Sequence, residues 1–152
     1  MVFTLGDDRF ATPLSQVKEV IALATITPLP DVPAYFKGLI NLRGKIISTI
    51  DLRVKLGIRV KPTTTKKPSI IISEIDDVVI GAIVDDVIEV VGIDESQIER
   101  NLDISSKVSR EYIAGVARSD TNPLTILLDI GKVLNVDELT SVRKHGATNS
   151  AA

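Results

Sequence analysis

The chain has 152 residues and a formal net charge of −2, which fit one ordinary domain or two very small ones fused into one body. The absence of cysteine excludes disulfides, thiolate zinc sites and cysteine nucleophiles, and a single histidine, His145, argues against a catalytic triad. Two tyrosines, three phenylalanines and a slightly acidic balance argue against a nucleic-acid surface, which needs basic stripes and stacking platforms.

The apolar residues favour strands over helices. Isoleucine and valine number 20 and 17, and β-branched side chains pack well on pleated surfaces. The composition therefore predicts an all-β fold. No apolar run reaches the length of a membrane span and the N-terminal residues carry no signal-peptide pattern, so we expect a cytoplasmic protein without membrane insertion.

The first half of the chain predicts short strands separated by turns. A strand at 2–5 and extended structure at 10–14 form a hairpin, residues 17–23 fit a strand or a short helix leading into one, and three prolines keep 28–34 extended. The later elements are an apolar segment at 35–42, a turn at Arg43-Gly44, a strand at 46–52 and a short helix capped by Asp51 and stopped by Gly57.

A polar, basic stretch at 60–68 is linker-like, and the strand pattern restarts after it. The expected elements are a hairpin of 70–72 and 78–84 around Asp76-Asp77, a strand at 87–91, a capped turn at 94–98, extended structure at 112–117, a strand at 124–128, a helix capped by Asp129 that runs to Leu134, and a small helix at 136–143. We expect a flexible tail at 144–152.

The two halves of the chain resemble each other. A shift of 70 places residues 6–20 on 76–90, and a shift of 77 places Tyr35 and Gly38 on Tyr112 and Gly115. Chance alignment of β-rich segments is the alternative explanation. A duplication predicts two units of about five strands each, approximately 1–60 and 68–135, with strands possibly exchanged, and a partner groove between them.

No catalytic constellation stands out. The acidic pairs Asp76-Asp77 and Asp85-Asp86 fit turn and solvated-edge positions, because neighbouring strand residues face opposite ways. The chain carries no phosphate-loop or zinc-protease motif, so we expect no enzyme activity, no cofactor and no metal.

The sequence around Arg43 supports two hypotheses about the role of this residue. In the first, Arg43 is a solvated residue of a tight turn. In the second, it is a guanidinium fork held rigidly at a barrel mouth, where it clamps a carboxylate or carbonyl of a partner, and Gly38 permits a close backbone approach.

At these residues the chain resembles the CheW family, the coupling proteins of bacterial chemotaxis. The resemblance covers about residues 2–139. It is carried by PLSQVKEV (13–20), TPLPDVP (27–33), GLINLRG (38–44), IDLR (50–53), VDDV (84–87), YIAG (112–115) and ILLD (126–129).

The resemblance implies two five-stranded SH3-like β-barrels packed together in one CheW-like domain over 1–143, with short helices near the C-terminus. It implies a non-catalytic adaptor that joins the regulatory domain of the histidine kinase CheA to the cytoplasmic tips of methyl-accepting chemoreceptors, and so locates the protein at receptor arrays. The alternatives are a paralogue that serves a pilus-motility or other array, and a small-ligand-binding β-barrel.

The family motif also indicates candidate contact residues. The receptor-facing candidates are Val17, Glu19, Gly38, Ile40, Leu42 and Arg43, although Arg43 could instead hold the junction between the barrels. Ile70 and Ile71 are candidates for kinase contact, because they form an apolar run on a strand that we expect at the outside. We expect Arg43→Ala or Gly38→Asp to weaken coupling in a protein that stays folded.

Overall fold

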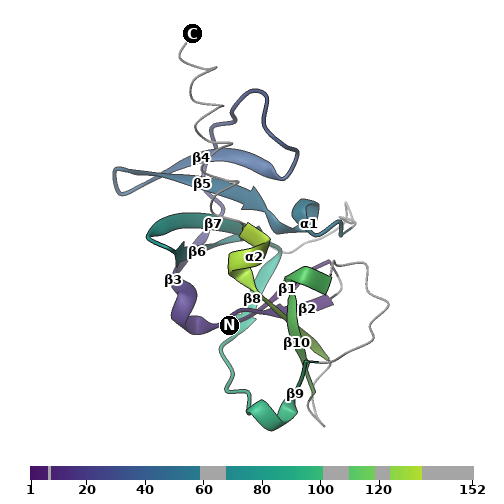
Figure 1. The fold of residues 1–152 in the computed structure, drawn as a ribbon. Coiled ribbons are helices and arrows are strands. Elements are labelled where there is room, and N and C mark those ends of the chain that lie inside the picture. The colour runs from purple at the N-terminus through teal and green to yellow at the C-terminus, as the bar shows by residue number, and fades with distance from the viewer. Residues whose placement is uncertain (7, 59–67, 101–109, 119–123, 135–152) are drawn as a thin grey trace.

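The computed structural model describes residues 1–6, 8–58, 68–100, 110–118 and 124–134. Their strands form two sheets (Figure 1). The six strands of sheet A are β1 (Val2–Leu5), β2 (Asp8–Ala11), β8 (Asp86–Glu89), β9 (Ile98–Glu99), β10 (Ile113–Ala117) and β11 (Thr125–Leu128). The five strands of sheet B are β3 (Val17–Ala22), β4 (Phe36–Leu42), β5 (Lys45–Asp51), β6 (Ser69–Ile75) and β7 (Val78–Val84).

The helices that accompany the sheets are all short. The α-helices are α1 (Leu52–Lys55) and α2 (Ile130–Leu134), and the 3-10 helices are η1 (Leu14–Gln16), η2 (Glu95–Gln97) and η3 (Arg110–Tyr112). The all-β prediction is therefore confirmed. The ambiguous segment at 17–23 forms a strand, preceded by the single turn η1.

The two sheets share one topology. Sheet B has the order β3-β6-β7-β5-β4, and sheet A begins β8-β1-β2-β11-β10 before it ends with β9. The parallel pair β5–β7 corresponds to the parallel pair β11–β2, and the remaining pairs in both series are antiparallel. Even a loop contact recurs, because Asp51 N–H donates to the Tyr35 carbonyl at 2.8 Å and Asp129 N–H to that of Tyr112 at 2.9 Å. These matches confirm the internal duplication.

Each half of the chain nevertheless contributes to both sheets. The first half contributes the hairpin β1–β2 to sheet A, whereas the corresponding hairpin β6–β7 of the second half lies in sheet B. The approximate division into 1–60 and 68–135 therefore does not separate the two sheets. The sheet partners of each hairpin are distant in sequence, which a division by sequence position cannot reveal.

Local sequence explains the turns. Asp76 and Asp77 have φ values of 49° and 64°, the left-handed conformation that a two-residue hairpin needs and that aspartate tolerates. The Asp51 side chain accepts a bond from Arg53 N–H at 3.0 Å and so caps α1. Gly57, with φ 72°, ends that helix.

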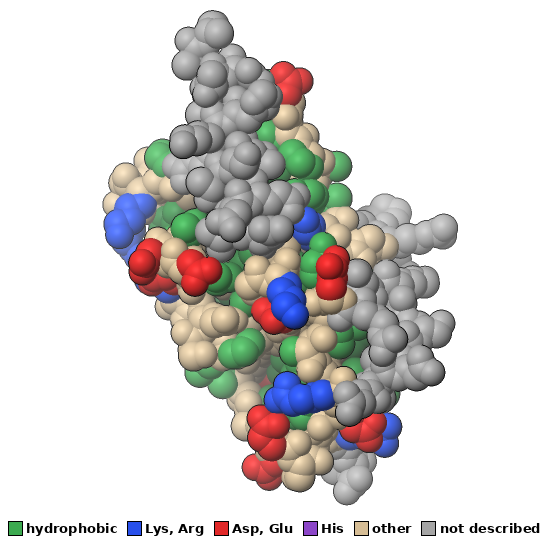
Figure 2. Space-filling model, in the orientation of Figure 1, with side chains coloured by type: hydrophobic (Ala, Val, Ile, Leu, Met, Phe, Trp, Pro, Cys, Tyr) green, Lys and Arg blue, Asp and Glu red, His purple; other side chains and the backbone are tan. Residues whose placement is uncertain are grey.

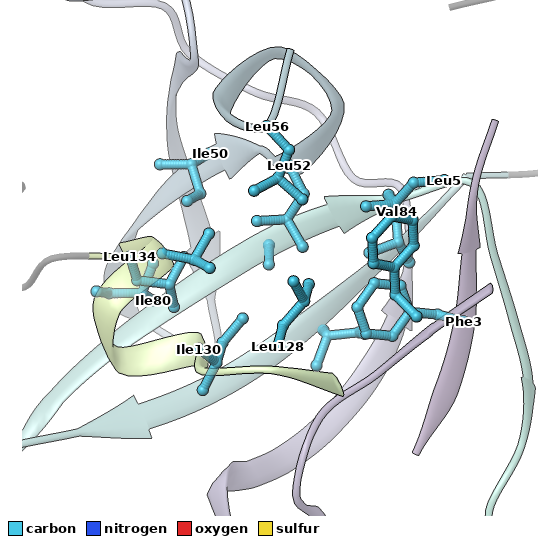
Figure 3. Close-up of a cluster of buried hydrophobic side chains, with 14 of the residues drawn as sticks. Phe3, Leu5, Ile50, Leu52, Leu56, Ile80, Val84, Leu128, Ile130 and Leu134 are labelled. Atoms are coloured by element: carbon cyan, nitrogen blue, oxygen red, sulfur yellow. The ribbon is translucent and has the colours of Figure 1, made fainter. Parts of the chain in front are cut away.

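The main core lies between the sheets. Figure 3 shows side chains from both sheets and both α-helices converging there, including Phe3, Leu52, Ile80 and Leu128. A second cluster belongs to sheet B alone and is formed by Ile40, Ile47, Ile70, Ile72 and Ile83. Sheet B therefore buries both of its faces, one against sheet A and one within its own curvature.

Three predictions lie outside the described residues. They are the linker, apart from Pro68, the small helix at 136–143 and the tail at 144–152, which also contains His145. Among the residues that are described, no helix is long and apolar enough to cross a membrane.

Candidate partner-binding site

The turn that joins β4 to β5 holds Arg43 in a defined position. Leu42 pairs with Lys45, so Arg43 and Gly44 form a two-residue loop with φ values of 52° and 83°. Both angles are positive, as a type I′ hairpin turn requires. The Asn41 side-chain oxygen accepts a bond from Gly44 N–H at 2.9 Å and fastens the loop.

The Arg43 guanidinium makes a bidentate ion pair with Glu19 on β3. The two nitrogen–oxygen distances are 2.7 and 2.8 Å. The Arg43 side chain is 74% exposed and the Glu19 side chain 28%. Hydrogen bonding to the guanidinium lowers the pKa of the Glu19 carboxyl and raises the pKa of Arg43, so both groups stay charged at neutral pH.

This ion pair joins the two ends of sheet B. The strands β3 and β4 are the first and last in its strand order, yet the β4–β5 turn reaches Glu19. The sheet must therefore curl until its edges approach each other, as in a small barrel. Arg43 lies where these edges meet, on the rim of sheet B, and its bonds within the described part of the chain stay in that sheet.

Several apolar residues lie close in sequence to Glu19 or to Arg43. Val17 and Leu42 are half-buried, whereas Leu14 on η1 and Val20 on β3 are 52% and 37% exposed. Sequence analysis missed Leu14 and Val20, although both stand in the family-like segment at 13–20. Val20 follows Glu19 directly on β3, so its exposed side chain lies on the opposite face of the strand from the ion pair.

Two predicted contact residues have internal roles. Ile40 is 2% exposed and belongs to the core of sheet B. Gly38 is buried, with φ 141°, and a Cβ there would lie 2.2 Å from the carbonyl oxygen of Thr27. Thr27 and Leu39 exchange two backbone bonds of 2.8 Å at this point. The close backbone approach that Gly38 permits is therefore to its own chain.

The expectation for Ile70 and Ile71 is wrong as to their position. Their strand, β6, lies between β3 and β7, not at the outside of sheet B. Ile70 is 0% exposed and Ile71 2%, and they enter the two different cores. An isoleucine run is typical of a strand with two buried faces, so it does not indicate a strand at the outside of the sheet.

A second arginine, Arg53, forms a buried ion cluster. Its guanidinium contacts Asp85 at 2.7 Å and Asp51 at 3.1 Å, and Asp85 also accepts a bond from Gly6 N–H at 2.6 Å. Bonding to Asp51 raises the pKa of Arg53. Asp85 is 4% exposed, so its prediction as a solvated-edge residue is wrong.

The cluster connects parts of both sheets. Arg53 lies on α1 after β5, Asp85 lies where the chain passes from β7 to β8, and Gly6 follows β1. The internal duplication aligns Arg53 with Gly131 and Asp85 with Ser15. The equivalent positions therefore carry no charged side chains and cannot form the same ion cluster. Its three charged residues stand in the motifs IDLR (50–53) and VDDV (84–87), but nothing in the sequence predicts their contact.

Charged side chains are distributed over the described surface without a metal-binding cluster. Among the described residues, no group of three or more histidine, cysteine, aspartate or glutamate side chains could hold a metal ion. Figure 2 shows acidic and basic side chains interspersed over the described part of one face.

The family model and the similar proteins all indicate the same family. Residues 1–138 match the family model of the CheW-like domain. The chemotaxis protein CheW of Treponema pallidum is 29% identical over 142 residues, which cover 91% of this chain and 83% of that protein. CheW of Thermotoga maritima is 33% identical over 138 residues, with 91% and 87% covered.

Two further similar proteins differ in how much of this chain their alignment covers. The crystal structure of the scaffolding protein TtCheW from Thermoanaerobacter tengcongensis superposes with a TM-score of 0.76 at 35% identity, covering 84% of this chain and 86% of that one. Protein PilI of Pseudomonas aeruginosa is 33% identical over 85 residues, which are 56% of this chain and 47% of that protein. The similarity to CheW proteins thus extends over more of the chain.

Proposed function

Because the chain belongs to the CheW family, we propose that it is a non-catalytic chemotaxis adaptor that couples the histidine kinase CheA to methyl-accepting chemoreceptors. The adaptor role follows from the family. The choice of these two partners is our proposal, as is a location in the cytoplasm at receptor arrays. The pilus-motility alternative has less support, since the match to PilI spans about half of the chain.

The observation that carries the proposed receptor site is the Arg43–Glu19 pair. Among the described residues, its bonds engage two of the five N–H donors of the guanidinium, and the side chain remains 74% exposed. A partner carboxylate or carbonyl can therefore reach the fork. The turn and Glu19 already hold the Arg43 guanidinium in place. Binding of a partner therefore costs little further side-chain conformational entropy.

In this proposal, exposed apolar side chains of the segment at 14–20 supply most of the binding energy. Leu14 and Val20 expose apolar surface and Val17 is half-buried beside them in the chain. A helical receptor tip with apolar residues and an acidic or carbonyl group fits this combination. Signalling would then rest on a coupling free energy between two binding sites and on no chemical step of the adaptor.

A binding experiment tests this site directly. We expect Arg43→Ala to weaken binding of a purified receptor-tip hairpin by about tenfold or more, because anchoring arginines are frequent hot spots. Calorimetry with the receptor tip and, separately, with the CheA regulatory domain measures the effect. Arg100→Ala is the matched control, since Arg100 makes a comparable exposed pair with Glu95 at 3.1 Å in another part of the chain.

The outcomes distinguish a wrong assignment of the receptor site from a wrong assignment of the adaptor function. If the unmodified protein binds neither partner, the proposed function is wrong. If it binds both partners and Arg43→Ala binds as tightly as Arg100→Ala, the adaptor function stands and the site assignment is wrong. Circular dichroism of each variant establishes that a loss of binding is not a loss of fold.

A further inference from the structure

The two sheets differ on their second faces, the faces that point away from the main core. In sheet B the second face carries the isoleucine cluster. In sheet A, Phe3 and Phe10 enter the main core, so their neighbours Thr4 on β1 and Arg9 on β2 point to the second face. Thr4 is 7% exposed and the Arg9 side chain 19%, so this face is largely buried as well.

The duplication identifies the residues that take these places in sheet B. Thr4 lies opposite Arg9 across β1 and β2, and the corresponding pair across β6 and β7 is Glu74 and Val79. Sheet A therefore has an arginine where sheet B has a valine. On the other side of Arg9, strand β11 places Thr125 next to it, and Thr125 is 6% exposed. Three polar side chains thus lie side by side on the second face of sheet A.

The next pair of residues on this face is smaller than its counterpart in sheet B. Ala117 pairs with Thr125 across β10 and β11, and the corresponding pair across β4 and β5 is Ile40 and Ile47. Both isoleucines belong to the cluster of sheet B. Room and hydrogen-bonding groups are the two conditions for an internal water molecule, and sheet A meets both better than the isoleucine-filled face of sheet B.

Two polar atoms of this face are buried without a hydrogen bond. Arg9 Nε and Thr4 Oγ1 have no partner within the described part of the chain, and both are almost inaccessible to solvent. The guanidinium is bonded at another nitrogen, since Arg9 Nη2 donates to Glu89 on β8 at 3.2 Å. Buried donors are costly to leave unpaired, and those of folded proteins nearly always bond to protein atoms or to ordered water.

We propose that Arg9 and Thr4 hold one ordered water molecule within sheet A. The water oxygen accepts a bond from Arg9 Nε–H, and the Thr4 hydroxyl is its second partner, as donor or acceptor. A charged ligand suits the position less, because Glu89 already balances the charge of the guanidinium and Nε is almost inaccessible from outside. Thr125 brings a further hydroxyl to the same face.

The water extends a polar connection across three strands of sheet A. Glu89 on β8 binds Arg9 on β2, and the water links Arg9 to Thr4 on β1, the strand between them. Because β8 is the first strand in the sheet order, this connection supports an edge of the sheet. Val79, the counterpart of Arg9 in sheet B, has no side-chain donor, so the equivalent connection cannot form there.

A crystal structure that resolves ordered water tests the site directly. We expect a water oxygen within hydrogen-bond distance of both Arg9 Nε and Thr4 Oγ1. A direct bond between the two side chains would overturn the proposal, and so would a map without density for water at this position.

Thr4→Val gives a second, independent measurement. The exchange keeps the shape of the side chain and removes its hydroxyl. If that hydroxyl bonds to nothing, the exchange relieves an unpaired group and the urea midpoint rises. If the hydroxyl holds the water, the exchange removes one of its partners, so we expect the midpoint to fall.

A double-mutant cycle with Arg9→Met shows whether the two side chains share the water. Thr4→Val should lower the midpoint less in the Arg9→Met chain than in the unmodified chain, because the water has already lost its donor. Glu89→Gln is the matched control, since it alters the bond at Nη2 and leaves Nε in place, so Thr4→Val should keep its full effect there.

Two outcomes of the cycle contradict the proposal. One is a midpoint that rises when Thr4→Val is introduced into the unmodified chain. The other is an equal effect of Thr4→Val with and without the Arg9 guanidinium. If Arg9→Met does not fold, the sign of the Thr4→Val change and the crystal structure decide the question.

Discussion

Arg43 and Arg53 both form ion pairs, and the surroundings of each arginine decide what its pair contributes. Arg43 is 74% exposed, so water and salt screen its pair with Glu19. Arg53 is 15% exposed and its partners Asp51 and Asp85 are each 5% exposed, so their charges depend on one another. At the residue scale, burial therefore separates an ion pair that a partner can reach from one that serves the fold.

We predict that Arg53→Met destabilises the isolated protein by about 3 kcal/mol, because it leaves Asp85 buried without its cation. Urea unfolding measures the loss. The control is Arg100→Met, which removes a pair that is 54% and 81% exposed and should change the free energy of unfolding little. Equal losses in the two variants would contradict a structural role for the buried cluster.

Gly38 gives a second prediction at this scale. Gly38→Ala should cost about 2 kcal/mol or more, since φ is 141° and the new Cβ would lie 2.2 Å from a backbone oxygen of Thr27. Gly38→Asp should then fail by losing the fold, which corrects our expectation of a folded, uncoupled variant. Gly92→Ala is the control, because nothing lies within 4 Å of its Cβ. Thermal unfolding that shows no difference between the two variants would refute the clash.

At the element scale, the β4–β5 hairpin combines two requirements that conflict at Arg43. The turn needs a positive φ, which is 52° at this residue and which asparagine or glycine adopts at less cost than arginine. An arginine in that conformation stores local strain. The hairpin as an element would fold more easily without it, so the residue is there for what its side chain contacts.

Arg43→Asn should therefore move stability and binding in opposite directions. We expect an unfolding midpoint equal to or above that of the unmodified protein, because an Asn-Gly turn suits this hairpin, together with weaker receptor-tip binding. Denaturant melts and calorimetry on the same preparations measure both. A variant that loses stability and keeps binding would show that Arg43 serves the fold.

At the scale of the whole molecule, we expect the two sheets to unfold as one cooperative unit. The main core draws on both sheets and both α-helices, and each half of the chain completes the sheet of the other. Neither sheet can unfold without exposing that shared core. The size of the chain also favours a single transition.

The two natural tyrosines can report on the two sheets separately. Tyr35 precedes β4 in sheet B and Tyr112 precedes β10 in sheet A. Tyr35→Phe and Tyr112→Phe each leave one fluorescent tyrosine, because the chain has no tryptophan. We expect each reporter to have the same urea midpoint as the circular dichroism signal of its own variant. Two separated midpoints within one variant would show that the sheets unfold independently.

Features encoded by neighbouring residues were predictable from the sequence. The turns at Asp76-Asp77 and Arg43-Gly44, the Asp51 cap, the duplication and the family motif all depend on residue types at short spacings. Each has a local physical cause, such as a positive φ or an unpaired helix N–H. Glu19 and Arg43 were therefore candidates from the sequence, although their bond to each other was not predicted.

Contacts between distant segments were decided only by the tertiary structure. Sheet membership, the burial of Ile70, Ile71 and Asp85, and the curl that brings Arg43 to Glu19 all depend on strands far apart in sequence. An isoleucine run reads the same whether one or both faces of its strand are covered. Composition and repeat thus determined that this is an all-β protein of two related units, whereas tertiary packing determined which segments build each sheet and which side chains remain exposed to a partner.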